Sequence, residues 1–143
     1  MAAISVVPDP VFAQEMVGPG IALAPTGAEK LTVCAPADGV VGALFPHAFT
    51  LETDLGPGVL VHLGIDTVSL GGAGFELLVH AGQFVRAGEP MIIWDPQPAL
   101  AQGLSLLCPI VLVQQPAAAL TLLAQPGAAV TAGDPLVGWD PLV

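Results

Sequence analysis

The sequence has almost no basic residues. Lys30 and Arg86 stand against twelve Asp and Glu residues, so the formal net charge at pH 7 is −10. Such a chain would repel a nucleic acid backbone, and no basic stripe is present to recruit one. The acidic field favours encounter with a basic protein partner instead, although solubility alone would explain it equally well.

A long apolar run is also missing, although 54% of the 143 residues are hydrophobic. The stretch 104–113 is interrupted by Pro109, and a membrane helix needs about 20 consecutive apolar residues. Residues 1–5 lack the basic segment and the long apolar segment of a secretion signal. We therefore expect a cytoplasmic protein with no direct membrane insertion.

Cysteine is scarce as well. Cys34 and Cys108 follow no metal-binding or redox spacing, so we expect two free thiols. The length predicts one domain over residues 1–143, and a domain of this size can bury roughly 68–70% of its unfolded surface.

Glycine and proline are abundant, with 17 and 15 residues, and short runs rich in Val, Ile and Leu lie between them. This rhythm is typical of an all-β fold, so we predict an antiparallel β-sandwich or barrel with few short helices. A short helix is expected over 99–106, whereas 116–125 fits a turn of helix and a buried strand equally well. The predicted strands are 20–24, 31–34, 39–45, 47–53, 59–65, 84–85, 90–94, 110–113, 129–130 and 136–139.

An internal repeat supports this fold. Residues 82–95 match residues 127–140 at seven of fourteen positions, and each copy has an Ala-Gly turn followed by an acidic residue. The unit resembles the hairpin of biotinyl and lipoyl carrier domains. Those domains need an acceptor lysine at the hairpin tip, and Lys30 lies in neither copy. A swinging-arm carrier is therefore not expected.

Two histidines lie on the strands of a predicted hairpin. His47 and His62 flank residues 54–57, which are dense in turn formers. Because strand side chains alternate with period two, a four-residue loop places positions whose numbers sum to an odd value on one face. This register pairs Phe49 with His62 and leaves His47 on the diagonal, about 7–8 Å away at the backbone. An odd loop would separate the two imidazoles.

The predicted hairpin face also carries Phe49, Leu51 and Leu60. Two imidazoles that share a small anion there would lie in an apolar, poorly solvated setting. A phosphoryl group would be shielded from water in such a place.

Seven segments, spread in order over almost the whole chain, resemble the glucose-type IIA phosphocarrier domain of the bacterial sugar phosphotransferase system. They are residues 8–13, 16–22, 35–39, 47–49, 61–68, 82–85 and 133–135. The segment 61–68, Val-His-Leu-Gly-Ile-Asp-Thr-Val, is the most specific. The resemblance implies a β-sandwich built on a duplicated hybrid motif, which agrees with the internal repeat.

The resemblance also implies a phosphotransferase component with a phosphohistidine intermediate. His62 corresponds to the residue that accepts the phosphoryl group on Nε2, and His47 to the partner that hydrogen-bonds this group. The implied donor is the phosphocarrier HPr, and the implied acceptor is a cysteine of the IIB domain of a sugar permease. A neutral imidazole is nucleophilic near pH 7, and phosphoryl transfer depends mainly on alignment and charge stabilisation. No metal and no cofactor are expected.

A docking face around the histidines is implied in addition. Acidic residues on its rim suit a basic partner, while central apolar contacts hold it. The corresponding apolar positions are Phe12, Met16, Val17, Leu60 and Val68, and the acidic ones are Asp9 and Asp66. The chain departs from the family just before His47. Phe45 stands where the family usually has a threonine, two residues before the first histidine, and the loop there is about two residues shorter than in the family.

Alternative functions follow from the same residues. His62 and Asp66 have the His-x-x-x-Asp spacing of lysostaphin-like zinc endopeptidases, but the His-x-His pair that completes such a zinc site is absent from the sequence. A regulatory binding module that has lost transfer is a further alternative. Asp66 would serve equally well as a cap of the turn that follows the strand, and His80 matches no motif and is expected to face solvent.

Overall fold

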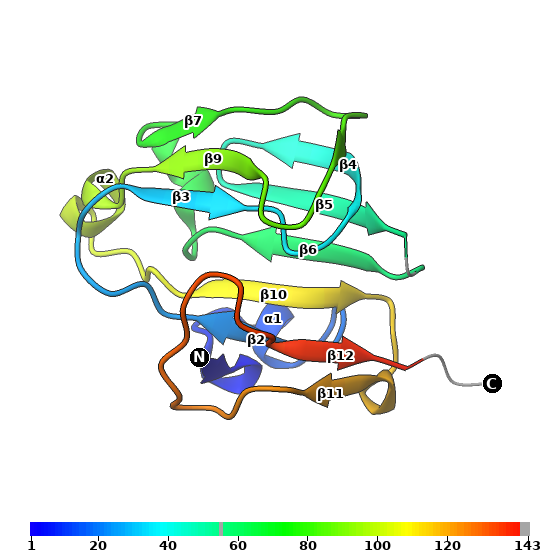
Figure 1. Cartoon of the computed structure of the whole chain (residues 1–143). Coiled ribbons are helices and arrows are strands. Elements are labelled where there is room, and N and C mark those ends of the chain that lie inside the picture. The colour runs from blue at the N-terminus through cyan, green and yellow to red at the C-terminus, as the bar shows by residue number, and fades with distance from the viewer. Residues whose placement is uncertain (55, 141–143) are drawn as a thin grey trace.

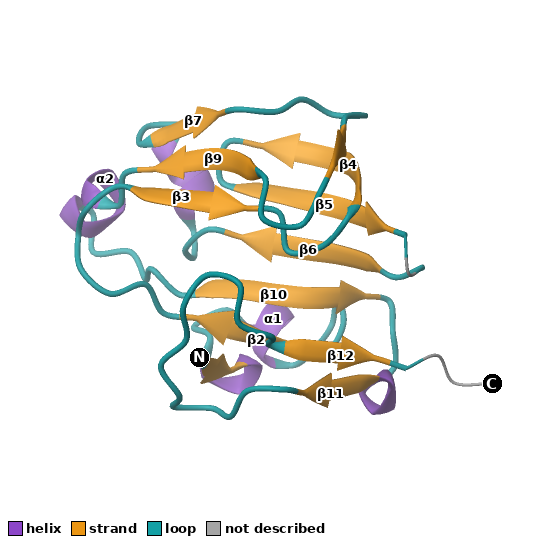
Figure 2. Ribbon diagram, viewed as in Figure 1, coloured by secondary structure: helices purple, strands orange, loops and turns teal. Residues whose placement is uncertain are grey.

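The structure is a computed structural model that describes residues 1–54 and 56–140. Strands dominate, and the helices are short (Figure 2). The helices are η1 (Ile4–Val6), α1 (Pro10–Ala13), η2 (Thr67–Leu70), α2 (Gln97–Ala101) and η3 (Ala117–Ala119), where η denotes a 3-10 helix. None of the helices in the described ranges is long and apolar enough to cross a bilayer.

The strands form three antiparallel sheets (Figure 1). The largest has the order β1-β2-β10-β6-β5-β4-β8, the second is β3-β9-β7, and β11 pairs with β12 alone. The bounds are β1 (Ala2–Ala3), β2 (Gly20–Leu23), β3 (Leu31–Cys34), β4 (Gly39–Phe45), β5 (Ala48–Thr53), β6 (Gly58–His62), β7 (Phe75–Leu77), β8 (Phe84–Val85), β9 (Pro90–Trp94), β10 (Cys108–Val113), β11 (Leu120–Leu122) and β12 (Val137–Trp139). The predicted antiparallel β-sandwich is confirmed.

The main core lies between the seven-stranded and three-stranded sheets. Phe49 and Leu51 of β5 point into it from one side, and Ile92 and Trp94 of β9 from the other. This is the alternation expected of strands with one buried face. The Trp94 ring stacks on that of Phe75, with ring centroids 5.8 Å apart.

A second apolar cluster covers the opposite face of the large sheet. The N-terminal segment supplies Ile4, Val7 and Phe12, which pack on Ala22 of β2 and Val111 of β10. The segment is folded onto the sheet by α1, which begins with Pro10 and is capped by the Asp9 side chain. Figure 1 shows α1 beside β2 and β10, and this packing brings Phe12 to the end of β6.

Several predicted elements differ from the structure. Residues 129–130 form no strand, and the predicted helix 99–106 is instead α2 (Gln97–Ala101), followed by Gly103 at φ +69°. A glycine in this left-handed conformation commonly ends a helix. The ambiguous stretch 116–125 contains both alternatives, a short 3-10 helix and then β11. Strands β1 and β7 and helix α1 were not predicted, because each is too short to show a period.

Candidate functional site

His62 is the last residue of β6, and its ring is fixed by the backbone that follows. The Nδ1 atom donates a hydrogen bond to the Gly64 carbonyl oxygen at 2.5 Å. A carbonyl can only accept, so Nδ1 carries the proton and Nε2 of the neutral ring has a free lone pair. The chain can turn back in this way because Gly64 adopts φ +77°. Nε2 is therefore the ring nitrogen whose lone pair is available for nucleophilic attack.

His47 lies in the two-residue turn, Pro46 and His47, that joins β4 to β5. Its carbonyl oxygen accepts a hydrogen bond from the Leu63 backbone N–H at 2.7 Å. This bond ties the turn to the chain just after His62. The two imidazoles meet as a result, with ring centroids 5.0 Å apart and planes at 69°.

The predicted hairpin register is wrong, yet the histidines still meet. Ala48 pairs with His62 and Phe49 pairs with Val61. The numbers of two paired residues therefore sum to an even value, not to the odd value that was predicted. The shift arises at the loop. The Pro57 carbonyl oxygen accepts hydrogen bonds from the backbone N–H and the hydroxyl of Thr53, so the loop between these two residues has three residues and not four. In this register a strand residue at position 47 would point away from His62. His47 escapes this rule because it lies in the turn, where the strand alternation does not apply.

The apolar surroundings of the histidines also differ from the prediction. Phe49 and Leu51 are on the core face of β5, whereas Leu60 shares the face of His62 and packs on the second cluster. The neighbours of the imidazoles are instead two phenyl rings. The Phe12 centroid is 5.5 Å from that of His62, and the Phe45 centroid is 6.0 Å from that of His47.

Both imidazoles are held towards their neutral form. Burial lowers the pKa of His62 below its usual value, while the Gly64 hydrogen bond and the carboxylates of Asp9 and Asp66 act in the opposite direction. Burial also lowers the pKa of His47, and the neighbouring His62 adds to this effect. A neutral pair near pH 7 offers a free lone pair for attack and ring N–H groups that can bind an anion.

The two predicted acidic residues flank His62 in different ways. Asp9 caps α1, because its Oδ1 accepts a hydrogen bond from the Val11 N–H at 2.9 Å. Asp66 is exposed, lies in the left-handed region at φ 60°, and makes no side-chain cap to the helix that follows. Its side chain is therefore free to face a partner, and the alternative reading of Asp66 as a cap is not supported.

The predicted apolar face divides into an exposed part and a supporting part. Met16 and Val68 are 69% and 66% exposed. Val17 and Leu60 are half-buried against the second cluster, and Phe12 is buried beneath the His62 ring. Phe45 was not predicted for this surface, yet it is 54% exposed and its ring lies beside that of His47. The Pro-His turn directly after Phe45 was the signal that could have revealed its position.

No group of three or more His, Cys, Asp or Glu side chains in residues 1–54 and 56–140 is arranged to hold a metal ion. No observation therefore favours the zinc endopeptidase alternative. His80 is exposed, and Cys34 and Cys108 are free thiols, as expected.

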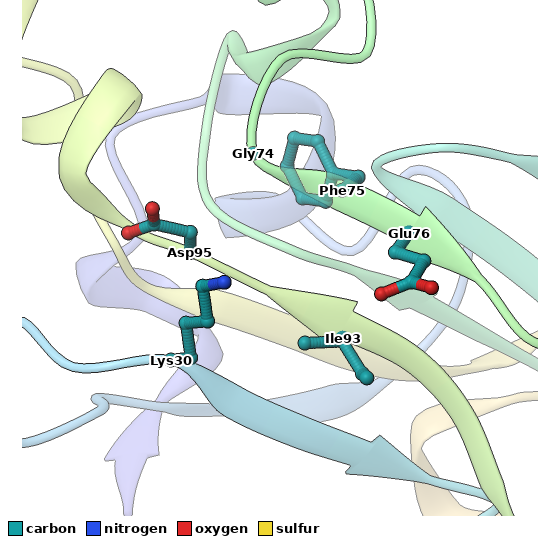
Figure 3. A pocket seen from close by; sticks show the side chains of 6 residues that line it. All are labelled: Lys30, Gly74, Phe75, Glu76, Ile93 and Asp95. Atoms are coloured by element: carbon teal, nitrogen blue, oxygen red, sulfur yellow. The ribbon is translucent and has the colours of Figure 1, made fainter.

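Both histidines are half-buried, so their rings still reach the surface. A hollow of about 220 Å³ on the three-stranded sheet is lined instead by residues that include Lys30, Phe75 and Asp95 (Figure 3). A second hollow lies beside η1 and β11 and also contains neither histidine.

Comparison with known families decides the relationship. The model of the family "phosphoenolpyruvate-dependent sugar phosphotransferase system, EIIA 1" matches residues 1–118. The chain belongs to this EIIA family. The predicted resemblance to glucose-type EIIA domains is confirmed, because relatives of the chain are named as glucose-specific EIIA or EIIBCA components.

The glucose-specific EIIA component of Staphylococcus epidermidis is 42% identical over 108 residues, which are 74% of this chain and 63% of that protein. The glucose-specific EIIBCA component of Corynebacterium glutamicum is 45% identical over 111 residues. The N-acetylglucosamine-specific EIICBA component of Klebsiella pneumoniae is 46% identical over 111 residues. Each of the last two matches covers 76% of this chain but only 16% or 17% of the relative, so the chain spans about one sixth of their length.

The solved structure of the glucose permease IIA from Mycoplasma capricolum is similar to this EIIA chain. The TM-score is 0.69 at 36% identity, over 77% of this chain and 71% of the other. The β-sandwich is therefore shared with a solved member of the family.

Proposed function

We propose that this EIIA domain is a phosphohistidine carrier of the sugar phosphotransferase system, in which His62 receives the phosphoryl group on Nε2. The observation that carries the proposal is the hydrogen bond from His62 Nδ1 to the Gly64 carbonyl, which leaves Nε2 free. The His47 ring centroid is 5.0 Å from that of His62, which supports a role for His47 as donor of an N–H to a phosphoryl oxygen.

The transfer needs little beyond this geometry. As the bond from phosphorus to the donor's leaving atom breaks, the bond from phosphorus to Nε2 forms. The His62 ring keeps its proton on Nδ1 and gains positive charge. The Gly64 carbonyl and the carboxylates of Asp9 and Asp66 stabilise that charge. The return step reverses these changes, with no metal and no cofactor.

We further propose that the donor is HPr and that the acceptor is a cysteine of a IIB domain. Both histidines reach the surface, and Met16 and Val68 of the predicted docking face are exposed, which suits protein partners. The names of the Corynebacterium and Klebsiella relatives combine EIIA with EIIB and EIIC, which supports a IIB acceptor. We also propose that this chain is cytoplasmic and forms one phosphocarrier domain over residues 1–143. Asp9 and Asp66 would form the rim of its docking face.

The test is phosphate transfer from labelled phosphoenolpyruvate through Enzyme I and HPr. We expect one acid-labile phosphate per chain and none in His62→Ala. The matched control is His80→Ala, which removes an exposed histidine outside the site and should accept phosphate normally. Unchanged labelling of the His62 variant would exclude the assignment.

A further inference from the structure

Phe45 lies beside His47 because of a β-bulge in β4. Val41 pairs with Leu51 but Leu44 pairs with Phe49, so Gly42 and Ala43 together oppose Thr50. The Thr50 hydroxyl accepts a hydrogen bond from the Ala43 N–H at 2.8 Å, which holds the extra residue in place. A bulge of this kind reverses the faces of the residues that follow it.

The reversal decides where Phe45 points. Without the bulge, Phe45 would lie on the same face as Val41, which is 1% exposed in the core. With the bulge, Leu44 packs on the core and Phe45 pairs with Ala48, on the face that carries His62. The fold therefore places a large aromatic ring on the outer surface, where it is 54% exposed.

The exposed Phe45 ring contacts an imidazole that has little else to hold it. The ring centroids of Phe45 and His47 are 6.0 Å apart with planes at 34°, which is within the range of favourable aromatic pairs. His62 has a backbone hydrogen bond to fix its ring. Within the described part of the chain, neither ring nitrogen of His47 has such a partner, and only the His47 backbone is tied down.

We propose that Phe45 is a positioning residue, whose ring holds the His47 imidazole against His62 and keeps water from its outer side. The proposal rests on the proposed phosphocarrier function. Phe45 itself does not contact the phosphoryl group. It restricts the rotation of the His47 ring so that an N–H points towards Nε2 of His62, where the phosphoryl group would sit.

The alternative is that Phe45 only contacts the protein partner, as its exposure would allow. The two roles predict different kinetics. A docking contact changes the concentration of partner needed for half-maximal rate, whereas a positioning residue changes the rate at saturating partner. It also changes the titration of His47 in the absence of any partner.

The test compares Phe45→Ala, Phe45→Leu and Phe45→Tyr with the control Phe84→Leu. Phe84 is 47% exposed on β8, the strand on the other side of β4, and offers a phenyl ring outside the site. NMR would give the His47 pKa, and single-turnover kinetics would give the rate from phospho-His62 to a IIB domain. For Phe45→Ala we expect a His47 pKa closer to its usual value and a roughly 10-fold slower step at saturating IIB.

Phe45→Tyr keeps the ring, so its His47 pKa and its rate at saturating IIB should match those of the wild type. Phe45→Leu should fall between Phe45→Ala and the wild type in both. Phe84→Leu should behave as the wild type. The inference is overturned if Phe45→Ala leaves the His47 pKa and the saturated rate unchanged and raises only the IIB concentration required. If the wild type accepted no phosphate, the proposed function would fall, but the titration would still decide whether Phe45 positions His47.

Discussion

The two halves of the imidazole pair are held by different means. On one side His62 ends a strand, and its Nδ1 is bonded to the backbone of Gly64. On the other side His47 lies in a turn, where its backbone is bonded to Leu63, while its ring has no hydrogen-bond partner among the described residues and lies beside the rings of Phe45 and His62. A nucleophile must present one defined nitrogen, which a directional hydrogen bond secures. The orientation of the His47 ring depends instead on the rings of Phe45 and His62 that lie beside it.

Replacement of His47 should show the largest difference between the halves. In His47→Gln the backbone of His62 is untouched, so Nε2 should still accept phosphate from HPr. Onward transfer should slow by about 10²-fold, because a positioned proton donor is lost. Pre-labelled protein mixed with a IIB domain in a quench-flow apparatus gives this rate. Loss of phosphate acceptance instead would show that the two halves are not separable.

The substitution Gly64→Ala should disturb the backbone that holds the His62 ring. An added Cβ would lie 2.7 Å from Thr67 Cγ2 and 3.0 Å from the Ser105 carbonyl oxygen, at φ +77°. We expect a loss of about 1–3 kcal/mol in unfolding free energy and about 10-fold slower phosphate acceptance. The control is Gly82→Ala, at φ +86° with nothing within 4 Å, which should destabilise less and leave acceptance intact. Equal effects on acceptance would refute the role of Gly64.

The exposed apolar residues of the predicted docking face should contribute to partner binding alone. Met16→Ser and Val68→Ser remove side chains that are 69% and 66% exposed, so stability should change little. We expect the HPr concentration for half-maximal rate to rise several-fold, at about 1 kcal/mol for each contact. Leu123→Ser, at a residue 56% exposed in the loop after β11, is the control. A fall in the saturated rate would contradict a binding role.

Acidification should lower the free energy of unfolding, because both histidines take up protons more readily in the unfolded chain. The pKa values of His47 and His62 are lowered in the folded protein, so below about pH 6.5 the unfolded chain binds more protons. The unfolding free energy should therefore fall as the pH drops from about 6.5 through the folded pKa values. Urea unfolding at a series of pH values measures this slope. A double variant, His47→Gln with His62→Gln, should show a shallower slope, and an unchanged slope would exclude these two groups.

The sequence was sufficient for the motif and for many of the strand positions, because both depend on local residue types. The hairpin register was not accessible from it. Asp54 to Pro57 contains enough turn formers for a loop of three or four residues, and only the packed strands select one. The bulge at Gly42 was missed for the same reason, since it depends on a Thr50 hydroxyl across the sheet.

The internal repeat also shows which features can be predicted from the sequence and which cannot. Both copies make the predicted turn, in which the Glu89 side chain accepts from the Arg86 N–H and the Asp134 side chain from the Thr131 N–H. The first copy places Trp94 in the core, where it is 1% exposed, whereas its counterpart Trp139 is half-buried. Turn chemistry is local and was predictable. Burial depends on what the rest of the chain places against each copy.

The closeness of Trp94 to the Gly64 loop has an optical consequence. The chain contains no tyrosine and two tryptophans, so its near-ultraviolet emission comes from two indoles. Trp94 is buried with its Cζ2 only 3.6 Å from where a Gly64 Cβ would stand, while Trp139 is tied to Gln115 elsewhere. The proposed phosphoryl group on His62 would change the surroundings of the Gly64 loop, and the fluorescence of the unlabelled protein would report that change through Trp94.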